Sequence, residues 1–444
     1  MLNPEKSPLF YGWVIVIICW LANFVTSPMN PVVFSMFMDP MTEDLNISRA
    51  NLAWVFTIRQ ALAGLTAPLM GRLVDRYGAR WIGVASGIFA GALLFGIFFV
   101  HNVVWVYILF GATGLTGLAT FGANILSQVP VANWFIAKRG RAVALAGTGI
   151  GAGTAVLVPI SQLVIHTIGW RWAWVGFGIL TWVVMIPTYG LFMRRKPEDV
   201  GLLPDGIKEQ TGTNSGNSTI ARPQLEEVNF TLKQAIRTKV FWFVVFGLLI
   251  YMFASSPVLL YRVSFWNELG ISPGAIAFGV ALDPFTVIFS VMIFGFLAEH
   301  FHLRFMAAAG GFWRGISGIP LLVRAARTSS MLIHNVTWGI GSGGYSIVQQ
   351  LIFPDYFGRE HQGAIRGFAA PFMIAGGALG GPLLGYFVDT DMGFNFVWIV
   401  CLFGMLLPGL AFSFMIPPQL KESDGNQIPS SHSDPATSQE FDKS

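Results

Sequence analysis

The sequence predicts an all-α membrane protein with 12 transmembrane helices in two pseudo-symmetric six-helix halves. Three observations lead to this fold class. Of the 444 residues, 54% are hydrophobic and only 11% are charged, whereas soluble domains carry about 25% charged residues. The apolar residues gather in continuous runs of about 20 residues, which is the length of a helix that crosses a bilayer. A charged segment at 71–80 returns as a weaker copy at 295–304, which is 224 positions later.

Each predicted span is a continuous apolar run rather than a series of short alternating segments. A transmembrane barrel would show alternating strands of about ten residues. A helix also satisfies its own backbone hydrogen bonds inside lipid, so helices are expected here. The expected spans are residues 10–37, 49–70, 79–100, 104–132, 139–166, 171–193, 239–265, 272–297, 304–324, 328–353, 363–388 and 393–416.

One long polar segment divides these spans into two sets of six. Residues 194–238 are rich in Ser, Thr, Asn and Gly, which is typical of a flexible linker. The predicted halves are therefore residues 1–193 and 239–416. Residues 417–444 have the same polar character and are expected to form a disordered cytoplasmic tail.

Lys and Arg residues are distributed unevenly between the two sides of the predicted membrane. Of the 27, 20 lie in segments on the side of the N-terminus. The positive-inside rule therefore predicts that both termini are cytoplasmic. Arg324 and Arg327 fall on the opposite side and run against the rule. Short loops and small tails favour a bacterial inner membrane, and we expect a monomer in the lipid bilayer.

The composition also excludes several classes of function. Basic residues lie in short loops rather than in one stripe, so we expect no nucleic-acid binding. Cys19 and Cys401 lie inside apolar runs without metal-ligand spacing, so we expect no metal and no cofactor. The sequence has no HExxH, GxSxG or phosphate-binding GxxxxGKS motif, and we therefore expect no enzyme.

The repeated charged segment is a candidate gate. It reads GRLVDRYGAR at 71–80 and GFLAEHFHLR at 295–304. Gly71 and Gly78 allow the chain to reverse within a few residues. Asp75 can accept hydrogen bonds from the N-terminal amides of the next helix and pair with a nearby arginine. The alternative is a solvated loop that is charged only to orient the protein. The predicted gating residues are Gly71, Asp75, Arg76, Arg80, Glu299 and Arg304.

Four ionisable residues fall well inside predicted spans, namely Arg59, Arg262, Asp283 and Arg314. Charge inside a membrane is costly and marks a functional site by default. The excess of positive charge suits an anionic ligand, because a guanidinium can hold a carboxylate through two hydrogen bonds. The alternatives are an internal ion pair, with Asp283 and Arg314 as the obvious partners, and an Arg262 side chain that reaches the membrane surface. A buried aspartate can also bind and release a proton, so Asp283 is the predicted coupling residue.

The sequence GRLVDRYGAR resembles the signature loop of the major facilitator superfamily, and the whole chain is similar to that family in architecture. Finer features resemble the branch of monocarboxylate porters and oxalate/formate exchangers. They are Tyr11, Gly12 and Trp13 at the first span and WFIAKRGRAVALAGTGIGAG at 134–153. The resemblance implies secondary active transport by alternating access, usually of small organic anions with a proton or by exchange.

In the resembled fold, spans one, four, seven and ten face a central path. Polar and aromatic residues on these spans are therefore candidates for binding substrate together with the buried arginines. The alternative for any single Asn or Gln is a hydrogen bond between helices. The candidates are Asn23, Asn124, Gln128, Tyr251, Asn335, Trp338 and Tyr345.

The sequence departs from that branch at the usual substrate arginine. Many monocarboxylate porters carry an arginine four residues after an aspartate in span eight, where this chain has Asp283 and then Val287. The basic residue of the exchangers in span eleven is also missing, since no charge follows Arg366 in that span. We expect Arg59, Arg262 or Arg314 to substitute, or else a substrate that is not a simple monocarboxylate.

The sequence therefore predicts a secondary transporter of a small organic anion, with a carboxylate and proton symport as the first choice. Anion exchange without net proton movement is the nearest alternative. A membrane sensor that binds a ligand without transporting it belongs to a different class. Such a sensor would be expected to carry a folded signalling domain, and the linker and tail are too short and too polar to supply one.

Overall fold

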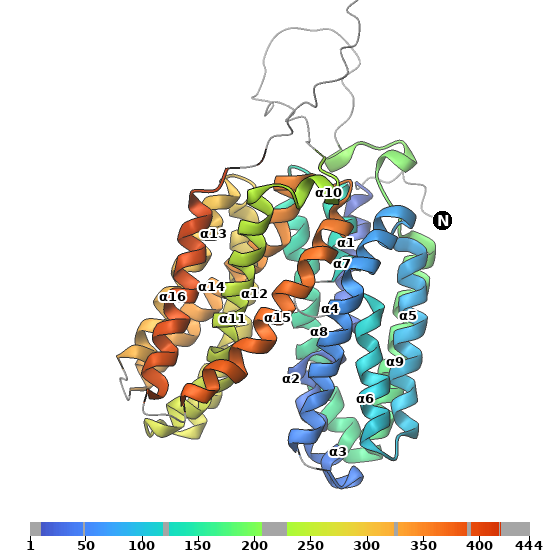
Figure 1. The fold of residues 1–444 in the computed structure, drawn as a ribbon. Helices are drawn as coiled ribbons and strands as arrows, with labels where there is room; N and C mark the ends of the chain where they lie inside the picture. Colours follow the sequence, from blue (N-terminus) through green and yellow to red (C-terminus); the bar gives the residue numbers. More distant parts are fainter. Residues whose placement is uncertain are drawn as a thin grey trace, which may run out of the picture.

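The computed structural model describes residues 10–47, 49–118, 124–206, 229–323, 327–388, 392–416 and 418. Arg324, the middle of the predicted linker and nearly all of the predicted tail lie outside the described residues. The described helices form two bundles, one from each half of the chain (Figure 1). The prediction of an all-α architecture is confirmed.

The two bundles follow one another along the chain. The helices of the first are α1 (Gly12–Val25), α2 (Pro31–Phe34), α3 (Met38–Leu45), α4 (Arg49–Tyr77), α5 (Ala79–Gly96), α6 (Val103–Ala112), α7 (Ile125–Trp134), α8 (Arg139–Ile168) and α9 (Trp170–Pro187). A short helix, α10 (Leu232–Ala235), leads into the second bundle. The helices of the second are α11 (Lys239–Glu268), α12 (Pro273–Leu297), α13 (Leu303–Leu322), α14 (Thr328–Phe357), α15 (Gln362–Val388) and α16 (Gly393–Ser413).

Within the described residues, seven helices are both long enough and apolar enough to cross a membrane, namely α5, α8, α9, α11, α12, α15 and α16. Helices α4, α13 and α14 have 29, 20 and 30 residues and reach the required length, but charged and polar side chains lower their hydropathy. Predicted spans one and four are broken into shorter pieces. In the fourth, a tight turn at Thr113–Thr116 and Gly117, with φ of 71°, ends the run of α6. The count of twelve spans therefore stays a prediction.

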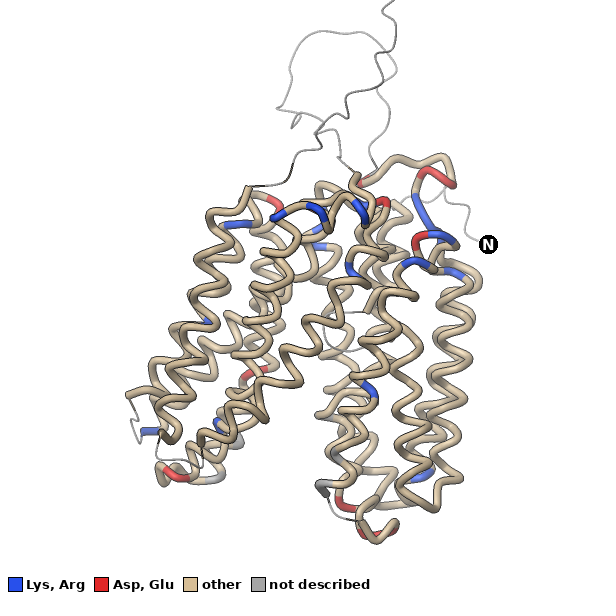
Figure 2. Tube along the Cα trace, viewed as in Figure 1, with Lys and Arg blue, Asp and Glu red and all other residues tan. Residues whose placement is uncertain are grey.

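The bundles touch along two equivalent pairs of helices. Helix α4 packs on α15, and α8 packs on α12. The bundles lie together at the end from which the linker leaves, here called the linker end, and diverge towards the opposite end (Figure 1). Lys and Arg residues gather at the linker end of both bundles (Figure 2). This distribution follows from the same charges on which the positive-inside prediction depends.

The charged segment at 71–80 is mostly helix and not the open turn that the sequence suggested. Helix α4 continues through Tyr77, and the chain reverses at Gly78, whose φ of 78° favours glycine. In the copy, α12 ends at Leu297 and α13 begins at Leu303. Gly71 is therefore needed for something other than a turn. A Cβ atom at Gly71 would overlap the backbone carbonyl of Gly363 on α15, so glycine lets the two backbones touch.

Both ends of the linker are fastened to the bundles. The Asp205 carboxylate accepts hydrogen bonds from the backbone N–H groups of Ile136, Ala137 and Lys138 at 2.9, 2.7 and 3.0 Å. The Asn229 side-chain oxygen accepts from the backbone N–H groups of residues 359–360 at 3.0 and 3.2 Å. These acceptors cap equivalent loops, one before α8 and one before α15. We call the two attachments the linker clips.

Candidate functional site

A carboxylate at the end of α4 joins the first half to the second. The Asp75 carboxylate accepts hydrogen bonds from the backbone N–H groups of Gly363 and Ala364, at 2.8 and 2.7 Å. Both donors lie in the first turn of α15, where free amides favour an anion. The sequence had predicted the amides of the next helix along the chain, whereas the donor helix is α15 in the other half. Burial raises the pKa of the Asp75 carboxyl to about 6.

The second half makes an equivalent contact with the first half. The Glu299 carboxylate, just after α12, accepts from the backbone N–H of Arg141 at 3.0 Å and pairs with its guanidinium at 2.8 Å. Arg141 lies in the first turn of α8. A Cβ atom at Gly140 would overlap the backbone of Gly295, so these backbones touch as Gly71 and Gly363 do. We call these two reciprocal contacts the paired latches.

The other predicted gating residues lie beside the latches without bridging the halves. Arg76 is exposed, with its guanidinium 5.3 Å from the ring centroid of Tyr77. The Arg80 guanidinium donates to the carbonyl of Gly190 at 2.9 Å, inside the first half. The Arg304 guanidinium lies 4.8 Å from the ring centroid of Phe305. Of the six predicted gating residues, Gly71, Asp75 and Glu299 lie at the contact between the halves.

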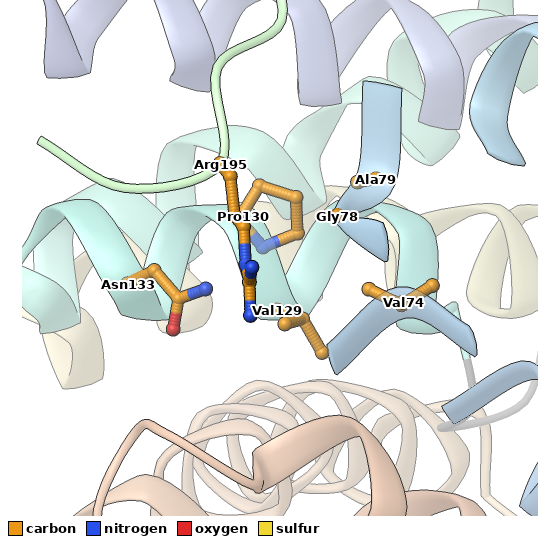
Figure 3. A pocket seen from close by; sticks show the side chains of 7 residues that line it. All are labelled: Val74, Gly78, Ala79, Val129, Pro130, Asn133 and Arg195. Atoms are coloured by element: carbon orange, nitrogen blue, oxygen red, sulfur yellow. The ribbon is translucent and has the colours of Figure 1, made fainter. Parts of the chain in front are cut away.

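A small cavity lies behind the first latch. Its volume is about 10 Å³, which is room for about one water molecule and far too little for an organic substrate. Arg195 closes one side of it and donates to the backbone carbonyl of Asp75 at 2.5 Å. The residues that line it are Val74, Gly78, Ala79, Val129, Pro130, Asn133 and Arg195 (Figure 3).

The linker end holds further contacts between the halves that the sequence did not reveal. Arg139 on α8 pairs with Asp355 on α14 at 3.0 Å. Arg366 on α15 donates to the side-chain oxygen of Gln128 on α7, and only 3% of Arg366 is exposed. The sequence analysis counted Arg366 with the basic residues on the side of the N-terminus, at the start of the predicted span 363–388. Gln128, a predicted substrate residue, is therefore engaged by this arginine.

Buried charges meet in the second bundle. The Arg262 guanidinium pairs with the Asp283 carboxylate at 2.5 Å and donates to the side-chain oxygen of Asn335 at 3.1 Å. The alternative of an internal ion pair is therefore present, but its arginine is Arg262 and not Arg314. The alternative of an Arg262 side chain that reaches the membrane surface is wrong, because Arg262 is buried. Spans seven and eight are neighbours just as spans eight and nine are, so adjacency along the chain did not decide between these partners.

Arg314 lies beside this pair on a platform of aromatic rings. Its guanidinium carbon is 3.5 Å from the ring centroid of Trp338, and its Nε donates to the Tyr251 hydroxyl at 2.5 Å. Tyr251 in turn stacks on Tyr345. The Arg262 guanidinium carbon lies 5.8 Å from the same Trp338 centroid, so one ring brings the two cations together. We call Arg262, Asp283, Arg314 and these rings, together with Asn335, the charged cluster.

Several polar atoms of the charged cluster are buried without a hydrogen-bond partner among the described residues. They are Nη1 of Arg314, Nε of Arg262, Oδ1 of Asp283 and the hydroxyl of Tyr345. Leaving such groups unpaired costs about 1–3 kcal/mol each, and more for charged groups. The cluster also holds two guanidinium groups for one carboxylate. Its chemistry therefore suits a ligand that brings negative charge and hydrogen-bond acceptors.

Arg59 lies apart from this cluster, in the first bundle. It is 1% exposed, and its guanidinium donates to the Thr113 hydroxyl at 3.0 Å and to the carbonyl of Leu118 at 3.1 Å. Both acceptors lie where predicted span four is broken, so Arg59 satisfies polar groups that the break exposes. These contacts favour a structural role over the predicted role in binding substrate.

Asn23 and Asn124 are also engaged inside the first bundle. The Asn23 amide donates to the carbonyl of Ala146 at 2.8 Å, and its oxygen accepts from the amide of Asn124. The Ser127 hydroxyl donates to the same oxygen at 3.3 Å. The network links α1, α7 and α8, which corresponds to the alternative of hydrogen bonds between helices.

Two bundles that repeat one another and meet at one end, with buried charges inside the second, are a construction found in many secondary transporters. The family model of the Major Facilitator Superfamily matches residues 12–266, and the chain belongs to this superfamily. It is therefore an integral, multi-pass membrane transporter and not an enzyme. The resemblance noted in the sequence is confirmed at the level of the superfamily.

Curated relatives confirm the finer resemblance. The chain is 24% identical over 438 residues to monocarboxylate transporter 12 of Homo sapiens, covering 91% of this chain and 80% of that protein. It is 22% identical over 402 residues to monocarboxylate transporter 2 of Homo sapiens, covering 88% of this chain and 82% of that protein. The chain is thus related to the monocarboxylate transporters.

Solved structures share the fold. The proton:xylose symporter XylE, bound to 6-bromo-6-deoxy-D-glucose, superposes with a TM-score of 0.68 at 14% identity, covering 90% of this chain and 94% of its own. FucP in the outward conformation superposes with a TM-score of 0.67 at 12% identity, covering 92% and 99%. The major facilitator fold is therefore confirmed.

Proposed function

We propose that this transporter moves a small organic anion, a carboxylate, by alternating access with proton symport. The observation that carries the proposal is the charged cluster, in which two buried guanidinium groups share one carboxylate. The names of the curated monocarboxylate transporters support the same class of substrate. The proposal places the substrate at Arg314 and the proton at Asp283.

Arg314 is suited to hold the carboxylate. Its Nε is already fixed by the Tyr251 hydroxyl and its flat face lies on Trp338, so little side-chain entropy remains to be lost on binding. Its buried Nη1 and the hydroxyl of Tyr345 in the same cluster have no hydrogen-bond partner among the described residues. A carboxylate accepts from both kinds of donor, which supports Arg314 as the substitute for the missing arginine of span eight.

Asp283 and Arg262 are suited to couple that binding to a proton. Protonation of Asp283 removes its charge and releases Arg262 from the ion pair, so a second guanidinium becomes available to the substrate. Loss of the proton restores the pair and expels the competing carboxylate. One proton and one monocarboxylate then cross together without net charge. Asn335, which accepts from Arg262, keeps that guanidinium in place during the exchange of partners.

The paired latches and the bonds beside them support a cycle that opens each side in turn. In the described arrangement the linker end is closed. We place this end in the cytoplasm, because most Lys and Arg residues lie there. The bacterial inner membrane rests on short loops alone and stays a prediction, since the relatives reported above are human proteins. The monomeric state also stays a prediction.

A two-step experiment tests this proposal. Purified protein is first screened by thermal shift against carboxylates, sulfonates, phosphonates and amino acids, because a ligand of the folded state raises the apparent Tm. The protein is then reconstituted into vesicles that contain a pH-sensitive dye, and the active carboxylate is added outside. Internal acidification that depends on protein and substrate supports symport. Uptake that requires internal substrate and leaves internal pH unchanged would assign exchange instead, and the absence of any binding carboxylate would refute the proposal.

A further inference from the structure

Arg366 is a buried cation that the charged cluster does not use. It lies on α15 at the contact between the halves, 3% exposed. Its guanidinium donates to the side-chain oxygen of Gln128 and to the backbone carbonyl of Gln350, and lies 5.6 Å from the ring centroid of Phe353. All of these partners are neutral. Within the described residues, Arg366 forms no salt bridge with a carboxylate.

The surroundings of Arg366 offer more donors than acceptors. Among the residues that the structure describes, its buried Nε has no hydrogen-bond partner. Gln362, four residues earlier on the same face of α15, is fully buried, and neither atom of its side-chain amide has a partner in this part of the chain. A buried guanidinium without a carboxylate carries a large desolvation cost. The Asp355 carboxylate interacts with Arg366 through space, but among the described residues no carboxylate forms a salt bridge with this guanidinium.

Opening of the linker end would change the partners of Arg366. Gln128 belongs to α7 in the first half, whereas Arg366, Gln350 and Gln362 belong to the second. When the halves separate there, Gln128 moves away and the guanidinium faces the opening with free donors. A carboxylate that leaves the charged cluster would then meet a second guanidinium on its way out.

We propose that Arg366 and Gln362 form a second carboxylate site, which is occupied only while the linker end is open. This inference rests on the proposed function and deepens it. In the closed arrangement, Gln128 acts as a neutral substitute for the carboxylate and keeps the guanidinium hydrogen-bonded. The site shortens the distance over which the anion must travel without a cationic partner, and it gives the linker side an affinity for the cargo.

Asp355 is the competing partner. It lies on α14 in the same half as Arg366 and pairs across the interface with Arg139. When the halves separate, Asp355 leaves Arg139 and could take the Arg366 guanidinium itself. The site would then be an internal ion pair without a role for the cargo. The experiment below separates the two partners.

The experiment measures how fast phenylglyoxal, which modifies accessible guanidinium groups, reacts with Arg366. Peptide mass spectrometry quantifies the modified side chain. Two proteins are treated with phenylglyoxal in vesicles. They are the wild type and the Gly71→Ala/Gly140→Ala variant, in which the close contacts of the latches are disturbed. Lactate and benzoate are the probes, with lactamide and benzamide as uncharged controls. We expect modification of Arg366 to be faster in the variant, and each carboxylate to slow it about tenfold, the effect of a charge-assisted hydrogen bond. The amides should not protect, and Gln362→Leu should weaken the protection.

Four results would overturn the inference. If phenylglyoxal modifies Arg366 of the latch variant at the same rate with and without added carboxylate, Arg366 holds no anion. A second result is that Arg366 of the latch variant reacts slowly with phenylglyoxal even when no carboxylate is added, and reacts faster once Asp355→Asn is introduced. That result assigns the guanidinium to an internal ion pair with Asp355. Lactate or benzoate can also raise the Tm in a way that depends on Arg314, while Arg366 is not protected from phenylglyoxal. That result overturns this second site and leaves the proposed function standing. If no carboxylate of the thermal-shift screen raises the Tm of the wild type, both proposals fail together.

Discussion

Adding one methyl group at Gly71 is expected to open the linker end. The new Cβ atom would overlap the backbone carbonyl of Gly363, and backbone cannot rotate away as a flexible side chain can. Overpacking of this kind costs about 1–3 kcal/mol, and only the closed arrangement bears that cost. A cost of about 2 kcal/mol changes the ratio of closed to open molecules roughly 30-fold. Alanine also favours a helix over glycine by about 1 kcal/mol, so the fold itself should not suffer.

Pulsed electron paramagnetic resonance measures this change as a distance between the bundles. Spin labels are placed at Glu43→Cys and Glu268→Cys, which are exposed positions at the end opposite the linker. The buried Cys19 and Cys401 are replaced by alanine. In Gly71→Ala, the population at the longer distance should fall as the opposite end closes.

A matched glycine provides the control. In Gly176→Ala, the added Cβ atom has no atom within 4 Å, so the distance distribution should stay that of the parent protein. Gly140→Ala, at the second latch, should act like Gly71→Ala. An unchanged distribution in both latch variants, with a normal apparent Tm, would show that close backbone contact does not hold the linker end. The same shift in Gly176→Ala would show that the effect is not specific.

Further predictions concern the charges. Asp283→Asn should retain exchange of substrate but lose internal acidification in vesicles. Acidification at the wild-type rate would show that Asp283 is not the coupling residue. Arg314→Lys should weaken carboxylate binding about tenfold or more, because lysine cannot both lie flat on Trp338 and bond the Tyr251 hydroxyl, and charge-assisted bonds contribute about 1.5–3 kcal/mol each. Arg59→Met should lower the apparent Tm while the Kd of the carboxylate stays constant. A weaker Kd with an unchanged Tm would instead show that Arg59 binds substrate. The closed latch holds a proton on Asp75 more tightly than water does, since its pKa of about 6 exceeds the usual value of about 3.9. Acidification from pH 7 to pH 5 should therefore favour the closed arrangement, and this gain should be lost as the pH rises through 6. The charged groups that face Asp75 are His361 and Arg195. The spin-label distances measure this dependence, and Asp75→Asn should abolish it.

The sequence predicted the broad architecture because membrane solvation leaves a strong signal in composition. Long apolar runs, one polar linker and the repeat of a glycine with a carboxylate four residues later were enough for the two halves. Asp75 and Glu299 were also matched as equivalent residues, and the structure gives them equivalent contacts. The helices that donate to these carboxylates were missed because the contacts cross between halves, which no local pattern records.

The candidate site was only partly predictable. Asn335, Trp338 and Tyr345 were candidates for binding substrate on predicted span ten, and all three belong to the charged cluster. Spacing does not fix how a helix is rotated against its neighbours, so it could not decide whether Asp283 pairs with Arg262 or Arg314. Arg366 was missed because a basic residue near a polar turn looks the same whether the helix end faces solvent or the other half.

The linker clips have a practical consequence. Asp205 fastens the outgoing chain to the first bundle, and Asn229 fastens the returning chain to the second. Each bundle therefore keeps its own cap if the chain is cut between these two residues. Two separately encoded fragments, 1–206 and 207–444, would each carry every clip contact that it needs. Such a divided protein would permit each half to be labelled, mutated or isotopically enriched independently before the two are brought together in one membrane.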